Sequence, residues 1–300
     1  MVSFVSLTKQ QLADKTKQIE DIIFRYLPVA VGEQKSVIEA MNYSILAGGK
    51  RLRPMLMKEV YEMFGGEGKI VEPFMAAIEM IHTYSLVHDD LPAMDNDEYR
   101  RGKKTTWAQF DECTAILAGD GLLNLAFETA LKAESENNPY LVRALGILAK
   151  KAGIYGMIGG QTADIEAEKP GSDVNGEKLL FIHEHKTAAL IQASMMIGAV
   201  LAGASDEETA QIETCAYNIG IAFQIQDDIL DVTSTLEVLG KPIGSDEKNN
   251  KKTYVSIYGL EKSKEDVRRL SKEAITILAS FGKRNLFLEE LVEQLINREK

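Results

Sequence analysis

The sequence predicts an all-α protein, and two observations carry that prediction. Apolar residues recur at spacings of three and four along almost all of the 300 residues, and no segment shows the sustained alternation of Val, Ile and Thr that is typical of strands. Glycine and proline interrupt this pattern at intervals of helix length. We expect helices at residues 8–27, 36–47, 53–64, 69–91, 105–117, 119–135, 138–168, 176–203, 206–235, 262–281 and 285–297.

Local signals set the boundaries of these helices. Glycine pairs at 48–49 and 65–66 end the second and third helices, and Pro92 ends the fourth because its ring clashes with the preceding turn. Ser205 and Glu208 form a capping box at the start of the ninth. No Gly/Ser-rich or highly charged linker divides the chain, so we expect one domain over residues 1–300. Further breaks are expected at Gly102, residues 137–139, residues 170–171 and Pro242.

The composition excludes several classes of protein. The formal net charge of -11 argues against a generic surface for nucleic acid or an anionic membrane. Two widely separated cysteines, Cys113 and Cys215, predict neither a disulfide framework nor a zinc cluster. The N-terminus lacks the pattern of a signal peptide, so we expect a cytoplasmic protein. The longest apolar passage, Ala188 to Ala204, is interrupted by polar residues and predicts a buried helix, because a membrane span needs about 20 apolar residues.

The helix expected at 206–235 carries three carboxylates on one face. At about 100° per residue, Gln224, Asp227, Asp228 and Asp231 fall within an arc of about 100°, opposite an apolar face. Like charges at this spacing repel each other, so a bound cation is the natural compensation. A solvated acidic face is the alternative for this cluster taken alone.

A further acidic cluster lies at the end of the helix expected at 69–91. Asp89 and Asp90 precede Pro92, so Asp95 must reach back from the following loop. Hard oxygen ligands without cysteines or a histidine cluster favour magnesium over zinc or copper. The loop does not match an EF-hand, because the glycine and the final glutamate of that motif are absent.

Basic residues accompany both acidic clusters. Arg100 and Arg101 follow the first cluster, and guanidinium groups match phosphate oxygens in pairs. Salt bridges within the loop are the alternative for these two arginines. Because magnesium usually shares its shell with water and phosphates, acids and bases together predict a pocket for one or two diphosphates bridged by Mg²⁺. Other basic residues lie in glycine-containing loops or within an apolar helix: Lys50, Arg53, Lys186, Lys241, Lys251 and Lys252.

Seven segments, taken in order, carry a resemblance that covers essentially the whole chain. They are GGKRLRP at 48–54, HTYSLVHDDLPAMD at 82–95, RRGK at 100–103, ILAGDGLL at 116–123, GGQTAD at 159–164, HKTAAL at 185–190, and FQIQDDILD at 223–231 with LGK at 239–241. With these segments the chain resembles the trans-prenyl diphosphate synthases, and most closely the bacterial farnesyl diphosphate synthases.

The resemblance implies a role for each matching residue. The magnesium ligands, or residues directly behind them, would be Asp89, Asp90, Asp95, Asp227, Asp228 and Asp231. The allylic diphosphate would be held by Arg100, Lys186, Lys241 and Lys251, with Thr187 and Gln224 lining the region where positive charge develops. Isopentenyl diphosphate would be held by Gly49, Lys50, Arg53, His82 and Arg101. Supporting groups would be Gln161 and Asp164.

The same resemblance implies a fold and a reaction. The family fold is a bundle of mostly antiparallel helices around a deep apolar cavity, usually in a homodimer. The expected reaction is the condensation of isopentenyl diphosphate with dimethylallyl or geranyl diphosphate, assisted by three Mg²⁺ ions. This chain departs from the family pattern at Asn96, Lys104, Trp107 and Val255, none of which is a proposed ligand.

Product length is expected to depend on residues below the first aspartate. At about 1.5 Å per residue, Ser85 lies about 6 Å and Tyr84 about 7.5 Å along the helix from Asp89. Related farnesyl synthases resemble this chain in an aromatic residue at the position of Tyr84 and in two extra residues, here Pro92 and Ala93. Tyr84 as the floor of the cavity would give a fifteen-carbon product, and an ordinary core tyrosine is the alternative.

Other functions stay open at this point. Geranyl or geranylgeranyl diphosphate synthases differ only in the length of their product. A terpene cyclase also uses two magnesium clusters on an α-helical bundle, but it does not need Lys50, Arg53 and Arg101 for a second diphosphate. A non-catalytic subunit of a heteromeric synthase would be expected to lose one acidic motif, whereas this chain has both.

Overall fold

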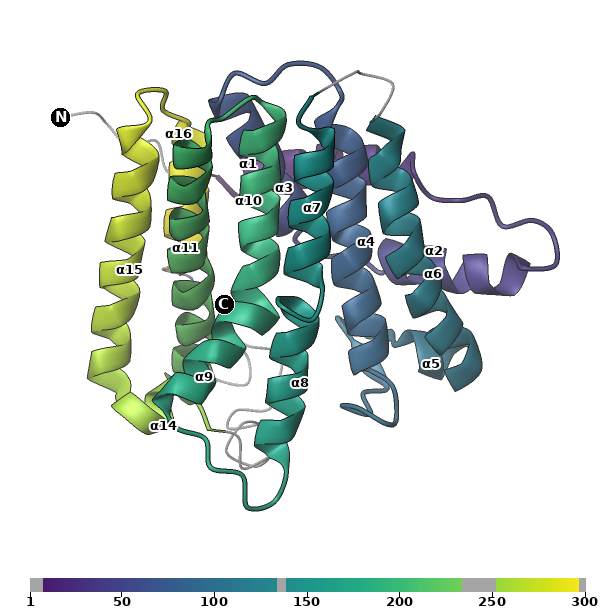
Figure 1. Ribbon diagram of the computed structural model, residues 1–300. Coiled ribbons are helices and arrows are strands. Elements are labelled where there is room, and N and C mark those ends of the chain that lie inside the picture. Colours follow the sequence, from purple (N-terminus) through teal and green to yellow (C-terminus); the bar gives the residue numbers. More distant parts are fainter. Residues whose placement is uncertain (1–7, 134–138, 234–251, 297–300) are drawn as a thin grey trace. The chain divides into compact units, whose positions relative to one another are not determined.

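A computed structural model describes residues 8–133, 139–233 and 252–296 (Figure 1). Its backbone contacts group into two compact units. The N-terminal unit comprises Thr8–Lys58 and Glu67–Leu145, and the C-terminal unit comprises Glu59–Gly66 and the described part of Gly146–Lys300. The single domain expected from the sequence stays a prediction.

The N-terminal unit consists of helices and one short hairpin. Its centre is α4 (Val71–Asp89), which packs against α1, α2 and α6. Every residue from Pro73 to Ile81 is buried, including one charged side chain, Glu79. The other elements are α1 (Lys9–Phe24), α2 (Lys35–Leu46), the first part of α3 (Leu52–Met63), β1 (Tyr99–Arg100), β2 (Lys103–Lys104), α5 (Thr106–Gln109) and α6 (Glu112–Leu131).

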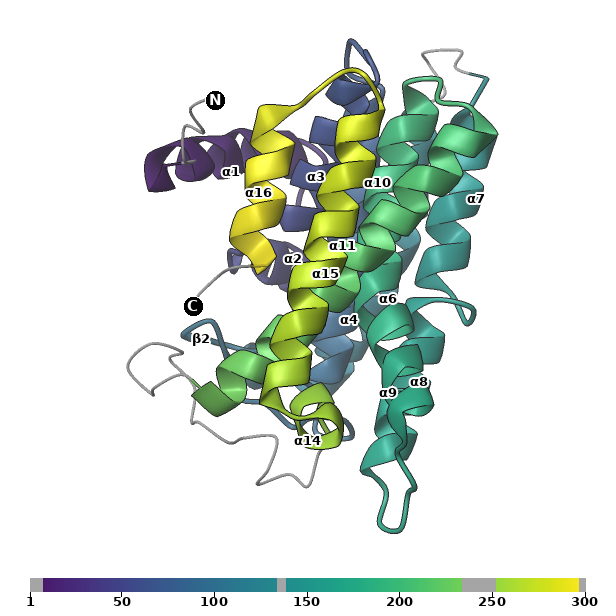
Figure 2. The ribbon, with the colours of Figure 1, turned by 90° about the vertical axis from the view of Figure 1, so that its left-hand side faces the viewer.

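The C-terminal unit is built around α10 and α11. Every residue of α10 (Ala189–Leu201) is buried, as expected for this apolar passage. The neighbouring α11 (Asp206–Thr233) lies between α10 and α15 (Leu260–Ser280) (Figures 1 and 2). None of the described helices combines the length and apolar character needed to cross a membrane. The other elements are most of α7 (Leu141–Ala152), α8 (Met157–Glu168), α9 (Gly176–Ile182), η2 (His183–Ala188), α14 (Tyr254–Tyr258) and α16 (Leu286–Ile296).

The all-α prediction is confirmed, but two expected boundaries are wrong. The helix break expected at residue 118 lies instead before α6, where the Asp111 carboxylate caps the helix by accepting the Thr114 N–H at 2.8 Å. Gly119 lies inside α6 and does not end a helix. A glycine is needed there because a Cβ would be 2.0 Å from His88 Nε2. The helix expected at 138–168 is interrupted between α7 and α8, where a Cβ on Gly156 would be 2.0 Å from the carbonyl oxygen of Lys151.

Three local features were not expected. Residues 176–203 contain a π-helical turn, η2, between α9 and α10. β1 and β2 form a hairpin whose two-residue loop, Arg101 and Gly102, has φ angles of 54° and 76°, as a type I′ turn requires. The short helix α14 begins with a capping box, in which Thr253 Oγ1 accepts the N–H of Ser256 at 3.1 Å.

Candidate active site

The first acidic motif lies where α4 ends and the chain reverses. Asp89 is the last residue of α4, and Asp90 caps it. After Pro92 the chain turns back, so that the Asp95 N–H donates to the carbonyl oxygen of Asp89 at 2.8 Å. Asn96 has a φ of 55°, in the left-handed region that asparagine tolerates better than most residues. The turn therefore brings Asp95 back to Asp89, as predicted, and its conformation suits Asn96.

Arg100 is fixed by the second aspartate of this motif. Arg100 Nε and Nη2 each lie 2.7 Å from Asp90 Oδ1, and Nη2 lies 3.6 Å from Asp97 Oδ2. Asp90 is 4% exposed. Burial acts to lower the pKa of Arg100, but the hydrogen bond and the charge of Asp90 raise it. Arg100 therefore forms the salt bridge within the loop that the sequence offered as the alternative to phosphate binding.

Arg101 takes a different direction from its neighbour. Its Nη1 donates to the carbonyl oxygen of Gly48. Gly49 makes room for this contact, because a Cβ on Gly49 would be 2.6 Å from Arg101 Nη1. The hairpin and the glycine turn thus bring together Gly49 and Arg101, two residues expected to hold isopentenyl diphosphate.

A buried ion pair that was not expected from the sequence anchors this glycine turn. Arg51 is 3% exposed and has a φ of 47°. Its guanidinium lies 2.7 Å from Glu79 Oε1 and 3.1 Å from Glu20 Oε1, and it donates to the carbonyl oxygen of Ile45 at 2.6 Å. The available signal was Glu79 itself, since a glutamate inside an apolar helix needs a buried partner. Arg51 thereby fixes the backbone between Lys50 and Arg53.

The pocket beside this turn carries an excess of positive charge. It is lined by His82, Arg100 and Arg101 among others. Burial lowers the pKa of Arg53 to about 10. The negative charge of Glu79 acts to raise this pKa, and the positive charge of Arg101 acts to lower it. Among the described residues, nothing accepts a hydrogen bond from the buried Arg53 Nε. An anion bound in the pocket would balance the positive charge of its lining.

The same environment keeps His82 neutral. Burial, followed by the positive charges of Arg53, Arg101, Arg100 and Arg51, holds the pKa of His82 well below its usual value. A neutral imidazole can still donate one hydrogen bond to a phosphate oxygen. An arriving diphosphate would raise this pKa, because negative charge favours the imidazolium.

The unliganded protein should therefore lose stability as the pH falls. His82 binds a proton more weakly in the folded protein than in the unfolded chain, where its pKa is about 6.5. Its contribution to the free energy of unfolding is therefore constant above that pH, and stability is lost below it. We expect His82→Gln to flatten the fall in melting temperature between about pH 6.5 and about pH 5. Melting curves of wild type, His82→Gln and a His185→Gln control check this. Equal slopes for wild type and His82→Gln would contradict it.

In the C-terminal unit, two of the residues predicted to lie in the site, Lys186 and Thr187, belong to the π-helical turn η2. Lys186 Nζ lies 2.6 Å from Asp164 Oδ2, and Gly160 allows the approach, because a Cβ there would be 2.1 Å from the Lys186 backbone nitrogen. Thr187 Oγ1 donates to Gln224 Oε1 at 3.0 Å. Asp164 is thus paired with Lys186, and its expected supporting role stays a prediction. π-Helical turns are frequent at functional sites.

The second acidic motif occupies the last turns of α11. Asp228 is 5% exposed and its Oδ2 accepts the backbone N–H of Tyr254 at 2.7 Å. Gln224 Nε2 donates to Asp228 Oδ1 at 3.5 Å. Asp227 and Asp231 are half-buried, so they are more open to a ligand than Asp228. Two expected ligands of the allylic diphosphate, Lys241 and Lys251, lie outside the described residues.

The acidic residues are compatible with magnesium. All of them offer carboxylate oxygen, the donor that Mg²⁺ prefers. Within residues 8–133, 139–233 and 252–296, no three His, Cys, Asp or Glu side chains form a group that could hold a metal ion. Magnesium commonly takes part of its shell from water and substrate phosphates, so a partial set of protein ligands suits it.

Tyr84 is buried below the first acidic motif. It is 5% exposed, and its ring meets the His88 ring edge-on at 5.9 Å. Its hydroxyl has no hydrogen-bond partner among the described residues. Burial, and then the charge of Asp89, raise the pKa of Tyr84 to about 12. Ser85 is half-buried and donates to the carbonyl oxygen of His82 at 2.9 Å.

Comparisons with known proteins show the family of this chain. Residues 34–291 match the Polyprenyl synthetase family. The chain is 49% identical over 259 residues to a heterodimeric geranylgeranyl pyrophosphate synthase large subunit of Arabidopsis thaliana, covering 84% of this chain and 69% of the relative. It is 45% identical over 262 residues to the farnesyl diphosphate synthase of Geobacillus stearothermophilus, covering 86% and 87%.

Solved structures are similar to this chain in fold as well as in sequence. An FPP/GFPP synthase from Zymomonas mobilis has a TM-score of 0.86 at 32% identity, covering 96% of this chain and 98% of its own. A geranyltransferase from Helicobacter pylori, in complex with magnesium and isoprenyl diphosphate, has a TM-score of 0.80 at 34% identity, covering 97% and 98%. The fold and these likenesses define a trans-prenyltransferase with the isoprenoid synthase fold. The chain belongs to the polyprenyl synthetase family.

Proposed function

We propose that this protein condenses isopentenyl diphosphate with dimethylallyl or geranyl diphosphate and releases farnesyl diphosphate. The observation that carries the proposal is the cationic pocket of the N-terminal unit, which is lined by His82, Arg100 and Arg101 and lies close enough to Arg53 for its charge to lower the pKa of His82. A second set of polar residues, with the cation Lys186 and the hydroxyl of Thr187, suits a second diphosphate. A terpene cyclase has one diphosphate to bind and does not explain the first pocket.

Each set of residues has a part in the reaction. Lys50, Arg53, His82 and Arg101 hold isopentenyl diphosphate, and Arg100 and Lys186 hold the allylic diphosphate together with Lys241 and Lys251. When bound, magnesium would neutralise diphosphate charge and favour its departure. Three ions would be held by carboxylates of Asp89, Asp95, Asp227 and Asp231, with Asp90 and Asp228 behind them.

The chemical step makes one carbon–carbon bond. The allylic C–O bond breaks, and its electron pair leaves with the diphosphate. The resulting allylic cation is attacked by the double bond of isopentenyl diphosphate, which then loses a proton. Oxygen atoms of Thr187 and Gln224 stabilise the positive charge, and the departed diphosphate accepts the proton.

A fifteen-carbon product is the finer part of this proposal. Tyr84 supports it, because a buried ring five residues before Asp89 would block further growth of the chain. The geranylgeranyl pyrophosphate synthase relative favours a twenty-carbon product as the second candidate. We further propose a homodimer and a cytoplasmic location, to be checked by light scattering and cell fractionation.

The test is incubation of the purified chain with isopentenyl diphosphate, dimethylallyl or geranyl diphosphate, and Mg²⁺. Chromatography of the dephosphorylated products should show farnesol as the main alcohol. Geranylgeraniol would favour the second candidate. No elongation by the chain alone would contradict the proposed activity and favour a subunit that needs a partner.

The role of Tyr84 can be tested separately. We expect Tyr84→Ala to shift the products toward twenty carbons, because removing the ring deepens the space below Asp89. Tyr84→Phe is the matched control, since it keeps the ring and removes only the hydroxyl. Unchanged product lengths in a folded Tyr84→Ala variant would remove Tyr84 from this role.

A further inference from the structure

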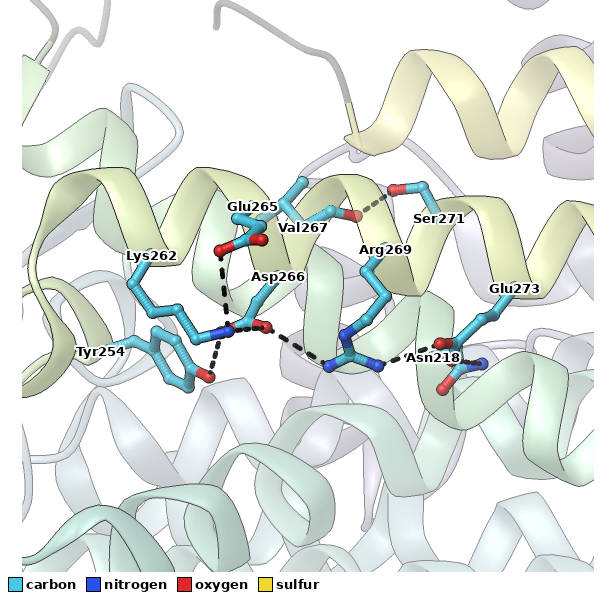
Figure 3. Close-up of polar contacts among 9 residues, drawn as sticks. All are labelled: Asn218, Tyr254, Lys262, Glu265, Asp266, Val267, Arg269, Ser271 and Glu273. Atoms are coloured by element: carbon cyan, nitrogen blue, oxygen red, sulfur yellow. Dashed lines mark hydrogen bonds and ion pairs between the residues drawn. The ribbon is translucent and has the colours of Figure 1, made fainter.

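A network of polar side chains on α15 reaches the second acidic motif through one tyrosine. Figure 3 shows Lys262, Asp266 and Arg269 along the side of α15 that faces Tyr254. Lys262 Nζ donates to Asp266 Oδ1 at 2.8 Å, and Arg269 Nη2 lies 3.4 Å from the same atom. Tyr254 Oη donates to Asp266 Oδ2 at 2.9 Å. Asp266 therefore receives hydrogen bonds from three side chains.

Asp266 is a buried anion at the centre of this network. Asp266 is 3% exposed, and this burial acts to raise the pKa of its carboxyl group. The hydrogen bonds from Lys262 and Tyr254, the charge of Lys262 and the bond from Arg269 outweigh burial and lower the pKa of Asp266. An ionised carboxylate is a strong acceptor, so the phenol of Tyr254 is held firmly.

Tyr254 connects this anion to Asp228. While its hydroxyl is held by Asp266, its backbone N–H donates to Asp228 Oδ2 at 2.7 Å. The ring of Tyr254 also stacks with that of His183 at 6.4 Å, and His183 Nε2 lies 3.8 Å from Asp228 Oδ2. Fixing the side chain of Tyr254 thus fixes the position of the N–H that binds Asp228.

The network also returns to α11 at a second point. Arg269 Nη1 donates to Glu273 Oε1 at 3.0 Å, and Asn218 Nδ2 donates to Glu273 Oε2 at 3.3 Å (Figure 3). α15 therefore contacts α11 at Asn218 through side chains, and reaches Asp228 through Tyr254. These two points bracket the segment that carries Gln224 and Asp227.

We propose that Tyr254 and Asp266 are positioning residues, which orient Asp228 and the adjoining Asp227 for magnesium diphosphate. The inference rests on the proposed function and adds residues that no expected set contained. Neither residue touches the substrate. Loss of the Tyr254 hydroxyl releases the N–H from its fixed place, so Asp228 loses a restraint and the motif becomes less preorganised for its ligand.

The experiment compares Tyr254→Phe with Tyr258→Phe. Both variants remove one phenol oxygen from α14, but Tyr258 is 44% exposed. Calorimetry with inorganic diphosphate and Mg²⁺ should show binding weakened about fivefold to tenfold in Tyr254→Phe, the effect of one lost hydrogen bond. We expect the KM for the allylic diphosphate to rise by a similar factor, with little change for isopentenyl diphosphate. Tyr258→Phe should match wild type.

Asp266→Asn supplies a second variant. It keeps an acceptor for the tyrosine hydroxyl, so we expect binding between that of wild type and that of Asp266→Ala. A lower melting temperature with unchanged diphosphate binding in both Tyr254→Phe and Asp266→Ala would overturn the inference, since it indicates a role in folding alone. A wild type that forms no product overturns the proposed function instead, whatever the variants bind.

Discussion

Asp89→Ala and Asp227→Ala are each expected to lower turnover by about two orders of magnitude or more, with the fold retained. Each substitution removes a carboxylate proposed to bind magnesium. Neither aspartate lies in a fully buried position, so little stability should be lost. Steady-state assays with saturating Mg²⁺, beside circular dichroism spectra, measure both effects.

Asp97→Ala is the matched control for these two variants. Its side chain is 53% exposed and lies in the same acidic loop as Asp95. We expect it to keep most of the wild-type rate. Near-normal turnover in Asp89→Ala or Asp227→Ala would refute the metal assignment for that residue, and an equally low rate in Asp97→Ala would indicate a general effect of loop charge.

Arg51→Met is expected to lower the free energy of unfolding by about 3–5 kcal/mol, because it leaves Glu79 buried without its principal partner. The double variant Arg51→Met, Glu79→Met should cost less than the sum of its singles, since no uncompensated charge then stays in the core. Urea denaturation of the unliganded protein measures all three.

The matched control is Arg25→Met. Arg25 also pairs with a glutamate of α4, at 3.1 Å from Glu72, but its side chain is 52% exposed. An exposed ion pair contributes about 0–1 kcal/mol, so this variant should unfold close to wild type. If Arg51→Met and Arg25→Met cost the same, the buried pair is not what anchors the glycine turn.

Helix periodicity predicted most of the fold, because helices such as α15 bury a stripe of residues at spacings of three and four. The helix expected at 206–235 is observed at Asp206–Thr233, and the one expected at 262–281 at Leu260–Ser280. Breaks were less predictable. Gly119, inside α6, lets that helix pack closely against His88 of α4, whereas Gly156 lies at a break between two helices. The sequence shows only a glycine at each position, and the difference depends on the residues that pack against it.

The site was predictable to the extent that it is local. Pro92 and the acids on either side of it indicated a chain reversal, and the reversal brings Asp95 to Asp89. Pairing between Arg51 and Glu79 joins residues 28 positions apart, and sequence patterns carry little information about such pairs. The contact of Tyr254 with Asp228 depends on where a helix of five residues begins, which periodicity cannot detect.

The two-residue turn of the hairpin has a consequence for how the chain can change. Arg100 ends a strand and Arg101 begins a left-handed turn, so their side chains leave the backbone in different directions, one to Asp90 and the other to Gly48. Inserting or deleting one residue here would change where both side chains leave the backbone. A substitution at either arginine alters one of these contacts, whereas a change in the length of the turn would misdirect both guanidinium groups at once.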